Sequence, residues 1–516
     1  MAEEMFWADQ MARKVIKERG EKSKYVVAAG ITPSGTIHIG NFREMITVEL
    51  VARALKSAGK QVRFIYSWDN YDRIRKIPAN VPKREELEKY MGQPVVDVPD
   101  TFGCHKSYAE HMEKDVADAL PVVGIMPEFI SQSKMYRDCV YAEEIKTCML
   151  AKEKIREVLN KFRKEPLPET WFPLHIYCEK CKKDEGRVTS YDNEYAVEYE
   201  CTCGHKGKVN FKERGIVKLP WRVDWPMRWH FEKVDFEPGG KDHSAPGGSW
   251  DTGSLIIKVV FNEEPPVYQM YDFVIPKGGG VKFSKSLGNV LKLTDVLEIY
   301  LPEIIRFMFA GTKPVKEFSI PMDEDIFKLY EDFFKVERIY YGKEDSSRAA
   351  HWKRVYEMSV PTEPLKEVPI QPSFKHCVEL IHIYRKPEEA VKNIKEKMDK
   401  EGRKRYLAML VCAKNWIDKY APEEYKFTVN EKVPDVSLMD AQKSAVRELG
   451  ARLEEAKDEA EMVNIFNELT KKHGLTTGEF FKACYLILLS KERGPRLAPF
   501  IMAIGKERVA KLFKSV

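Results

Sequence analysis

The sequence contains no apolar run that approaches the roughly 18 residues needed to cross a membrane. Its first ten residues, MAEEMFWADQ, do not join a basic segment to an apolar one, which is the pattern of a secretory leader. Internal repeats and low-complexity tracts are also missing. We therefore expect a folded cytoplasmic protein without a membrane partner.

The sequence also lacks a large excess of charge of either sign. The 85 basic and 80 acidic residues nearly offset each other and leave a net charge of +5, which permits a nucleic-acid partner without requiring one. Apolar residues make up 43% and charged residues 32%, as in soluble globular proteins. A length of 516 residues exceeds what one core can hold, so three or four domains are expected.

The N-terminal third has the pattern of a βαβ unit. A β-prone run at Tyr25–Ala29 leads into a glycine-rich turn, a helical pattern follows over Phe42–Ala58, and Gln61–Asp69 is typical of a second buried strand. This order predicts an α/β, Rossmann-type nucleotide-binding domain. Further strands are predicted at Ser254–Phe261 and Tyr268–Ile275, where they would complete a parallel sheet around an insertion.

The last third is rich in Lys and Glu at helical spacing, so an all-α C-terminal bundle or cage is expected. Four prolines in Pro361–Pro372 indicate a linker. The predicted domains are 1–99 and 216–280 for the two halves of the catalytic domain, 100–215 for a zinc-containing insertion, 281–360 for a loop and stem-contact region, and 361–516 for the helical domain.

Two groups of side chains have the spacing of metal ligands. Cys178 and Cys181, followed by Cys201 and Cys203, resemble a zinc ribbon with four thiolates, and His205 is an alternative ligand because CTCGH is tighter than the usual pair. Free thiols in a hairpin are the other interpretation.

The second group has ligands of suitable type within twelve residues: Asp100, Cys104, His105 and His111. Steps of four and seven predict Asp100, Cys104 and His111 on one face of a helix, with His105 beside them. A helix-capping Asp100 with ordinary surface histidines is the alternative.

The turn TPSGTIHIGN, Thr32–Asn41, stands where a strand passes into a helix. Backbone N–H groups and the helix dipole favour phosphate oxygens at such a place, Gly35 and Gly40 allow close approach, and His38 adds a donor. About 240 residues later, Lys282–Asn289 reads KFSKSLGN after the glycine-rich PKGGG. Two lysines three residues apart on such a loop suit a triphosphate whose pyrophosphate leaves.

Together these motifs resemble the class I aminoacyl-tRNA synthetases. His38-Ile39-Gly40-Asn41 is similar to the HIGH motif, with Asn41 in place of the last histidine, and Lys282-Phe283-Ser284-Lys285-Ser286 is similar to KMSKS. The resemblance implies catalytic roles for His38, Asn41, Lys282 and Lys285, with ATP and Mg²⁺ as cofactors. It implies ATP contacts from Pro33, Ser34, Gly35, His38, Gly40, Asn41, Lys282, Ser284 and Lys285.

Over nearly the whole chain the resemblance extends to the class I lysyl-tRNA synthetases, through GITPSGTIHIGN, GKDHSAPGGSWDTG, KFSKSLGN and KERGPRLAPF. It implies tRNA-Lys and L-lysine as partners, and a monomer. The glutamyl relatives place an arginine on the strand before the turn, where this chain has Val26, Val27, Ala28 and Ala29. The lysine pocket is expected to use Gly30, Thr32, Trp221, Asp242, His243, Tyr268 and Tyr271, whose acceptors and rings suit an ammonium group.

Three alternatives remain at this point. A glutamyl-type class I synthetase shares the two motifs. A nucleotidylyltransferase shares a similar turn and phosphate loop, although those enzymes are usually compact. A zinc-ribbon nucleic-acid-binding protein without catalysis would leave HIGN and KFSKS without a role.

Overall fold

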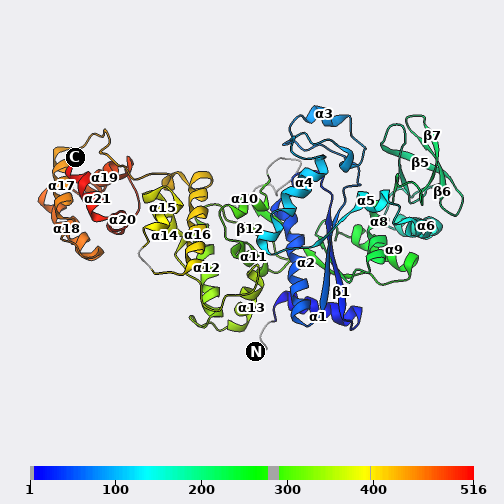
Figure 1. Ribbon diagram of the computed structural model, residues 1–516, viewed down its shortest axis with the longest axis horizontal. Helices are drawn as coiled ribbons and strands as arrows, with labels where there is room; N and C mark the ends of the chain where they lie inside the picture. Colours follow the sequence, from blue (N-terminus) through cyan, green and yellow to red (C-terminus); the bar gives the residue numbers. More distant parts are fainter. Residues whose placement is uncertain (1–4, 277–289, 395–396) are drawn as a thin grey trace. The chain divides into compact units, whose positions relative to one another are not determined.

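The computed structural model describes residues 5–276, 290–394 and 397–516 (Figure 1). The chain forms two compact units. The first comprises Met1–Leu297, Pro302–Ile320 and Ile339–Pro364, and the second comprises Glu298–Leu301, Pro321–Arg338 and Leu365–Val516. The domain boundaries predicted at residues 99, 215, 280 and 360 stay predictions.

A five-stranded sheet, all of whose pairings are parallel, forms the centre of the first unit, in the order β10-β9-β1-β2-β3. Its strands are β1 (Lys24–Ile31), β2 (Gln61–Trp68), β3 (Glu128–Ser131), β9 (Phe236–Gly240) and β10 (Val267–Tyr271). The first two confirm the strands predicted from Tyr25 and Gln61. From β1 the chain first adds strands toward β3 and later toward β10, so the order reverses between β1 and β9. Doubly wound folds bind ligands at this reversal.

The helix α2 (Ile39–Ser57) packs on β1, β2 and β9, and α1 (Trp7–Arg19) packs on α2 (Figure 1). Most side chains of α2 are buried, as expected for a helix that is apolar on nearly every side. The other helices of this unit are α3 (Arg84–Glu88), η1 (Val95–Asp97), α4 (Tyr108–Ala117), η2 (Leu120–Val123), α5 (Gln132–Arg137), α6 (Ala142–Leu150), α7 (Lys152–Asn160), α8 (Trp221–Glu232), α9 (Ser249–Phe261), α10 (Leu293–Leu297), α11 (Pro302–Ala310) and α13 (Ala349–Ser359).

The strand predicted at Ser254–Phe261 is wrong, because this segment is the second half of α9. The buried positions Thr252, Gly253, Ile256 and Ile257 recur at helical spacing, and the apolar run alone did not distinguish helix from strand. The sheet takes β9 instead. The strand predicted over Tyr268–Ile275 is divided between β10 and β11 (Val274–Pro276), which pairs with β12 (Phe318–Ile320) in a separate two-stranded sheet.

An antiparallel sheet in the order β7-β6-β5-β4-β8 carries the cysteine motif. Its strands are β4 (His175–Tyr177), β5 (Asp184–Tyr191), β6 (Ala196–Cys201), β7 (Lys206–Asn210) and β8 (Val217–Lys218). This sheet lies mostly within the insertion predicted at 100–215. The segment 100–215 also contains β3, which belongs to the central sheet. Part of the predicted insertion is therefore part of the nucleotide-binding fold.

Two arginines fasten α2 to later parts of the first unit. Arg306 on α11 pairs with Glu49 on α2 at 2.6 Å and donates to the Met358 carbonyl at 2.9 Å. Arg53 on α2 donates to the carbonyl oxygens of Val360 and Pro361, each at 2.6 Å. The end of the first unit is therefore held by the same helix that begins at the HIGN turn.

The described residues of the second unit contain helices and no strand, which confirms the all-α prediction. These helices are most of α12 (Asp325–Tyr340), α14 (Phe374–Tyr384), α15 (Pro387–Lys392), α16 (Lys400–Lys419), η3 (Glu423–Tyr425), α17 (Asp440–Arg452), α18 (Glu459–Lys472), α19 (Thr477–Leu489), α20 (Leu497–Ile504) and α21 (Lys506–Lys514). An apolar core joins α17 to α21. No helix in the described part of the chain is long and apolar enough to span a membrane.

Candidate active site and metal centres

A cavity of about 610 Å³ lies at the carboxyl ends of the central strands, beside the reversal of strand order. It is lined by Gly30, Ile31, Thr32, Ser34, His38, Gly40, Asn41, Glu44, Asp69, Asp72, Arg73, Arg75, Lys76, Trp221, Asp242, His243, Tyr271, Phe273 and Val274. A narrow branch of about 50 Å³, which we call the inner pocket, shares Gly30, Glu44 and Asp69 with it and continues to Arg228 and Glu237.

The HIGN turn forms the N-terminus of α2. Nδ1 of His38 accepts the N–H of Gly40 at 3.1 Å, and Oδ1 of Asn41 accepts the backbone N–H of His38 at 3.2 Å. Because Nδ1 is an acceptor, a neutral His38 ring carries its proton on Nε2, which is then a donor. A Cβ atom on Gly40 would stand 2.9 Å from the ring, so this close approach requires glycine.

Glu44 lies one turn further along α2 and faces the cavity. Its Oε1 accepts the N–H of Gly30 at 3.0 Å, and its Oε2 accepts the hydroxyl of Tyr271 at 2.6 Å. Burial raises the pKa of Glu44 to about 8, although both hydrogen bonds act in the opposite direction. A cation that entered the cavity would stabilise the ionised carboxylate.

Aromatic rings form the wall of the inner pocket. Trp221, Trp225 and Trp229 follow one face of α8, and the rings of Trp221 and Trp225 stack at 5.3 Å. The indole N–H groups of Trp225 and Trp229 donate to the two carboxylate oxygens of Glu237, at 2.9 and 2.7 Å. His243 lies 6.3 Å from Trp221, measured between ring centroids. Trp225 and Trp229 are buried, so they belong to the core as well as to this wall.

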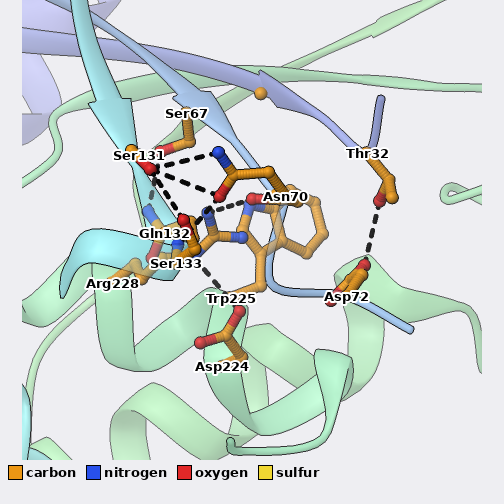
Figure 2. Close-up of polar contacts among 12 residues, drawn as sticks. Thr32, Ser67, Asn70, Asp72, Ser131, Gln132, Ser133, Asp224, Trp225 and Arg228 are labelled. Atoms are coloured by element: carbon orange, nitrogen blue, oxygen red, sulfur yellow. Dashed lines mark hydrogen bonds and ion pairs between the residues drawn. The ribbon is translucent and has the colours of Figure 1, made fainter. Parts of the chain in front are cut away.

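A buried network of charges lies beneath this wall. Arg228 on α8 pairs with Asp69 at 2.7 Å and with Asp224 at 3.4 Å. Lys218 pairs with Asp224 at 3.2 Å and with Asp72 at 3.0 Å. Figure 2 shows Arg228 and Asp224 on one helix, close to the polar residues at the ends of β2 and β3. Each buried cation therefore has carboxylate partners.

Most of the described residues predicted for substrate binding do meet at the cavity. Thr32 lines it, and its hydroxyl donates to Asp72 at 2.9 Å (Figure 2). Gly30, Ser34, His38, Gly40, Asn41, Trp221, Asp242, His243 and Tyr271 also line it. Pro33, Gly35 and Tyr268 do not. The Tyr268 ring stacks on Trp250 at 3.9 Å and its hydroxyl contacts Ser244. Lys282, Ser284 and Lys285 lie outside the described residues.

Several residues of the cavity and of the inner pocket were not predicted, among them Glu44, Asp69, Arg228 and Glu237. Glu44 had a detectable signal, since it follows Asn41 by three residues and so lies on the same face of the helix. Asp69 had one as well, because it directly follows a predicted strand of a parallel sheet. Arg228 and Glu237 had none, because the fold alone brings them to the inner pocket.

The four cysteines Cys178, Cys181, Cys201 and Cys203 have their sulfur atoms within 4.8 Å of one another. Sγ of Cys178 is 3.7 Å from that of Cys203, and Sγ of Cys181 is 3.6 Å from that of Cys201. Four thiolates bound tetrahedrally to zinc stand about 3.8 Å apart, so this group fits such an ion. His205 is not in the group. Its Nε2 lies 3.8 Å from Glu179.

Asp100, Cys104, His105 and His111 also bring one ligand atom each to within 4.8 Å of the others. Sγ of Cys104 is 3.1 Å from Nδ1 of both histidines. The prediction that Asp100, Cys104 and His111 share a helix face is wrong, because α4 begins only at Tyr108. Asp100 instead accepts the backbone N–H groups of Cys104 and His105 in a turn, which folds the ligands together.

The chain is similar to known proteins over nearly its whole length. Residues 5–362 match the family model described as tRNA synthetases class I (K). A lysine--tRNA ligase of Borrelia garinii subsp. bavariensis is 46% identical over 512 residues, with 98% of each chain covered. The lysine--tRNA ligase of Pyrococcus horikoshii is 42% identical over 519 residues, again with 98% of each covered. A solved glutamate tRNA ligase of Elizabethkingia meningosepticum, 14% identical, covers 95% of this chain and 98% of its own at a TM-score of 0.43. With the family model and the sequence relatives both extending over the HIGN turn and the cavity, the chain belongs to the class I (K) family of tRNA synthetases.

Proposed function

We propose that the chain is a class I lysyl-tRNA synthetase, which activates L-lysine with ATP and transfers the lysyl group to the 3′-terminal adenosine of tRNA-Lys. The observation that carries this proposal is the carboxylate of Glu44, held in the cavity by Gly30 and Tyr271 within reach of the HIGN turn. The family and the relatives support the same substrate class.

The ε-ammonium group of lysine would bind Glu44, because a charge-assisted hydrogen bond is the strongest contact available to it in this cavity. The methylene groups of the side chain would lie against Trp221 and His243, which line both the cavity and the inner pocket. Asp242, Gly30 and Thr32 are the proposed contacts for the backbone end of the substrate. The carboxylate of lysine would then face the N-terminus of α2.

In the first step, a carboxylate oxygen of lysine forms a bond to the α-phosphorus of ATP, supplied as its magnesium complex, and the bond to the bridging oxygen breaks to release pyrophosphate. Nε2 of His38 and the first N–H groups of α2 stabilise the negative charge on the phosphates. We assign Lys282, Ser284 and Lys285 to the leaving pyrophosphate. In the second step, a ribose hydroxyl of the tRNA attacks the carbonyl carbon of lysyl-adenylate, AMP leaves, and the hydroxyl proton passes to the phosphate or to water.

A glutamyl-type enzyme is less compatible with the cavity. A substrate carboxylate needs a cation, and the cation of the inner pocket, Arg228, is already paired with Asp69 and Asp224. Next to a substrate carboxylate, an ionised Glu44 would repel it, and a protonated Glu44 would supply no positive charge to balance it. A nucleotidylyltransferase does not account for a similarity to tRNA synthetases over 98% of the chain.

Zinc is the proposed ion for both groups of metal ligands. Four thiolates suit zinc, and so does a set of one carboxylate, one thiolate and two imidazoles. Neither group lines the cavity, and each offers four ligand atoms, which leaves no open position for a substrate. We therefore propose a structural role for both ions. A cytoplasmic location and a monomeric state stay predictions.

The proposal is tested by exchange of pyrophosphate into ATP, measured with each of lysine, arginine, ornithine and glutamate, and with and without tRNA-Lys. Exchange that depends on lysine is expected, with glutamate inactive. Robust exchange with glutamate would contradict the proposed substrate and leave the family assignment intact. Aminoacylation of tRNA-Lys with labelled lysine measures the second step.

A further inference from the structure

Arg228 occupies the inner pocket with a guanidinium group of its own. The residue is 7% exposed, and one of its terminal nitrogens lies 2.7 Å from Asp69. Its guanidinium carbon stands 5.3 Å from the ring centre of Trp221, which belongs to the same pocket. A planar cation is therefore already bound between a carboxylate and an indole face, and this is the arrangement that a guanidinium group prefers.

The carboxylates around the inner pocket differ in how many further hydrogen bonds they can accept. Both oxygens of Glu237 receive indole N–H groups, and Asp69 receives Arg228. Glu232, which also lines the pocket, pairs with Arg63 at 2.6 Å. Glu44 receives one hydrogen bond on each oxygen, from Gly30 and Tyr271, and each oxygen keeps one further lone pair. The pocket thus has room for one more small cation at Glu44.

Lysine and arginine place different demands on such a pocket. The ammonium of lysine is compact and can be satisfied by Glu44 together with neighbouring hydroxyl or water oxygens. The guanidinium of arginine is planar and carries five N–H donors, several of which would point toward Asp69, where Arg228 already lies. Those donors would stay unpaired beside a like charge, and an unpaired buried donor or charge is costly.

We infer that Arg228 is the residue that excludes arginine from the site, because its side chain holds the guanidinium position that a substrate arginine would need. The inference rests on the proposed function, since it concerns the choice between lysine and a second basic amino acid. Arg228 acts here as a specificity-determining residue, with no part in the chemical steps.

The test replaces Arg228 and measures exchange with lysine and with arginine. In Arg228→Ala the ratio of kcat/KM for lysine to kcat/KM for arginine should fall by about 10²-fold or more, chiefly through a gain with arginine. General damage to the fold does not create activity toward a new substrate. Guanidinium ion added to this variant should fill the vacated position and restore the preference for lysine. An unchanged ratio would overturn the inference.

Lys218→Ala is the matched control. Lys218 is a buried cation of the same network, paired with Asp72 and Asp224, but it does not line the inner pocket. Its removal should leave the ratio unchanged even where it lowers stability. Arg228→Gln keeps most of the side-chain volume without the charge, and it provides a second folded variant in which arginine use should rise.

The unaltered protein supplies a test that does not depend on any variant. Ornithine keeps a compact ammonium, so it should inhibit lysine-dependent exchange at lower concentration than arginine does. Inhibition by arginine at equal or lower concentration would overturn the inference. Lysine-dependent exchange in the same assay reports on the proposed function separately, so the failure of one is distinguished from the failure of the other.

Discussion

The hydroxyl of Tyr271, at the end of β10, donates a 2.6 Å hydrogen bond to Glu44 on α2. This contact joins an edge strand of the central sheet to the helix that begins at the HIGN turn. It holds the carboxylate in a fixed direction before a substrate arrives. Preorganisation of this kind lowers the cost of binding a cation.

Replacement of the carboxylate by an amide should weaken lysine binding selectively. Glu44→Gln keeps the shape of the side chain but loses the charge, so we expect the KM for lysine to rise by about 10–100-fold, the usual worth of a charged hydrogen bond. The KM for ATP should change little. Glu18→Gln on α1, an exposed site, is the control. Equal changes in both KM values would argue against the ammonium contact.

Lysine binding should also depend on pH. Burial raises the pKa of Glu44 to about 8, so the carboxyl group is mostly protonated at neutral pH in the absence of substrate. The lysine ammonium, with a pKa near 10.4, stays charged, and the KM for lysine should therefore fall about tenfold per pH unit as the pH rises toward 8. Steady-state exchange between about pH 6.5 and about pH 8.5 measures this, since Glu44 has a pKa in that range. The dependence should be absent in Glu44→Gln.

The close contact between Gly40 and His38 predicts a loss of activity without a loss of fold. In Gly40→Ala the new Cβ atom would meet the imidazole at 2.9 Å and displace it, so kcat for exchange should fall by about 10-fold or more. Gly478→Ala on α19 is matched to it, because no atom lies within 4 Å of its Cβ position. Normal exchange in Gly40→Ala would show that the position of His38 is not critical.

The role of Lys285 in catalysis is predicted from the KFSKS motif, and a rate measurement tests it. Lys285→Ala should lower the rate of adenylate formation by about 10²–10³-fold and leave lysine affinity nearly unchanged, because the charge acts on the transition state. Single-turnover measurements with saturating lysine separate the two effects. An equal loss in affinity and in rate would indicate a binding role instead.

Two zinc ions per chain are expected by emission spectroscopy on protein purified without a chelator. Cys181→Ser should lose one of them and destabilise the antiparallel sheet, because bound zinc supplies folding energy to small domains. His111→Ala should lose the other. Cys139→Ser, outside both groups, should retain two. A metal content unchanged by Cys181→Ser would refute the first centre.

The sequence was sufficient for the parts of the fold that depend on local pattern. The alternation of strand, glycine turn and helix placed β1, α2 and β2, and the cysteine spacing identified one group of candidate metal ligands. It failed where two local signals compete, as in Ser254–Phe261, which is rich in β-branched residues yet buries one helical face. It also missed β9, because FEPGG has the composition of a turn and becomes a strand only through pairing with β1 and β10.

The candidate site shows the same division. The residues of the HIGN turn are adjacent in sequence and were identified as a group. Glu237 on β9 and Arg228 on α8 are far from the turn in sequence, and only the folded chain brings them to the inner pocket. The four side chains of the second candidate metal group lie together as predicted, but a turn brings them together and not the helix that their spacing predicted.

The two hydrogen bonds of Arg53 attach a late segment of the first unit to α2. Val360 and Pro361 are clamped to α2, and residues 361–373 beyond them have no regular secondary structure. Loss of the Arg53 guanidinium would release these two carbonyl groups from α2, the helix that His38 caps at its other end.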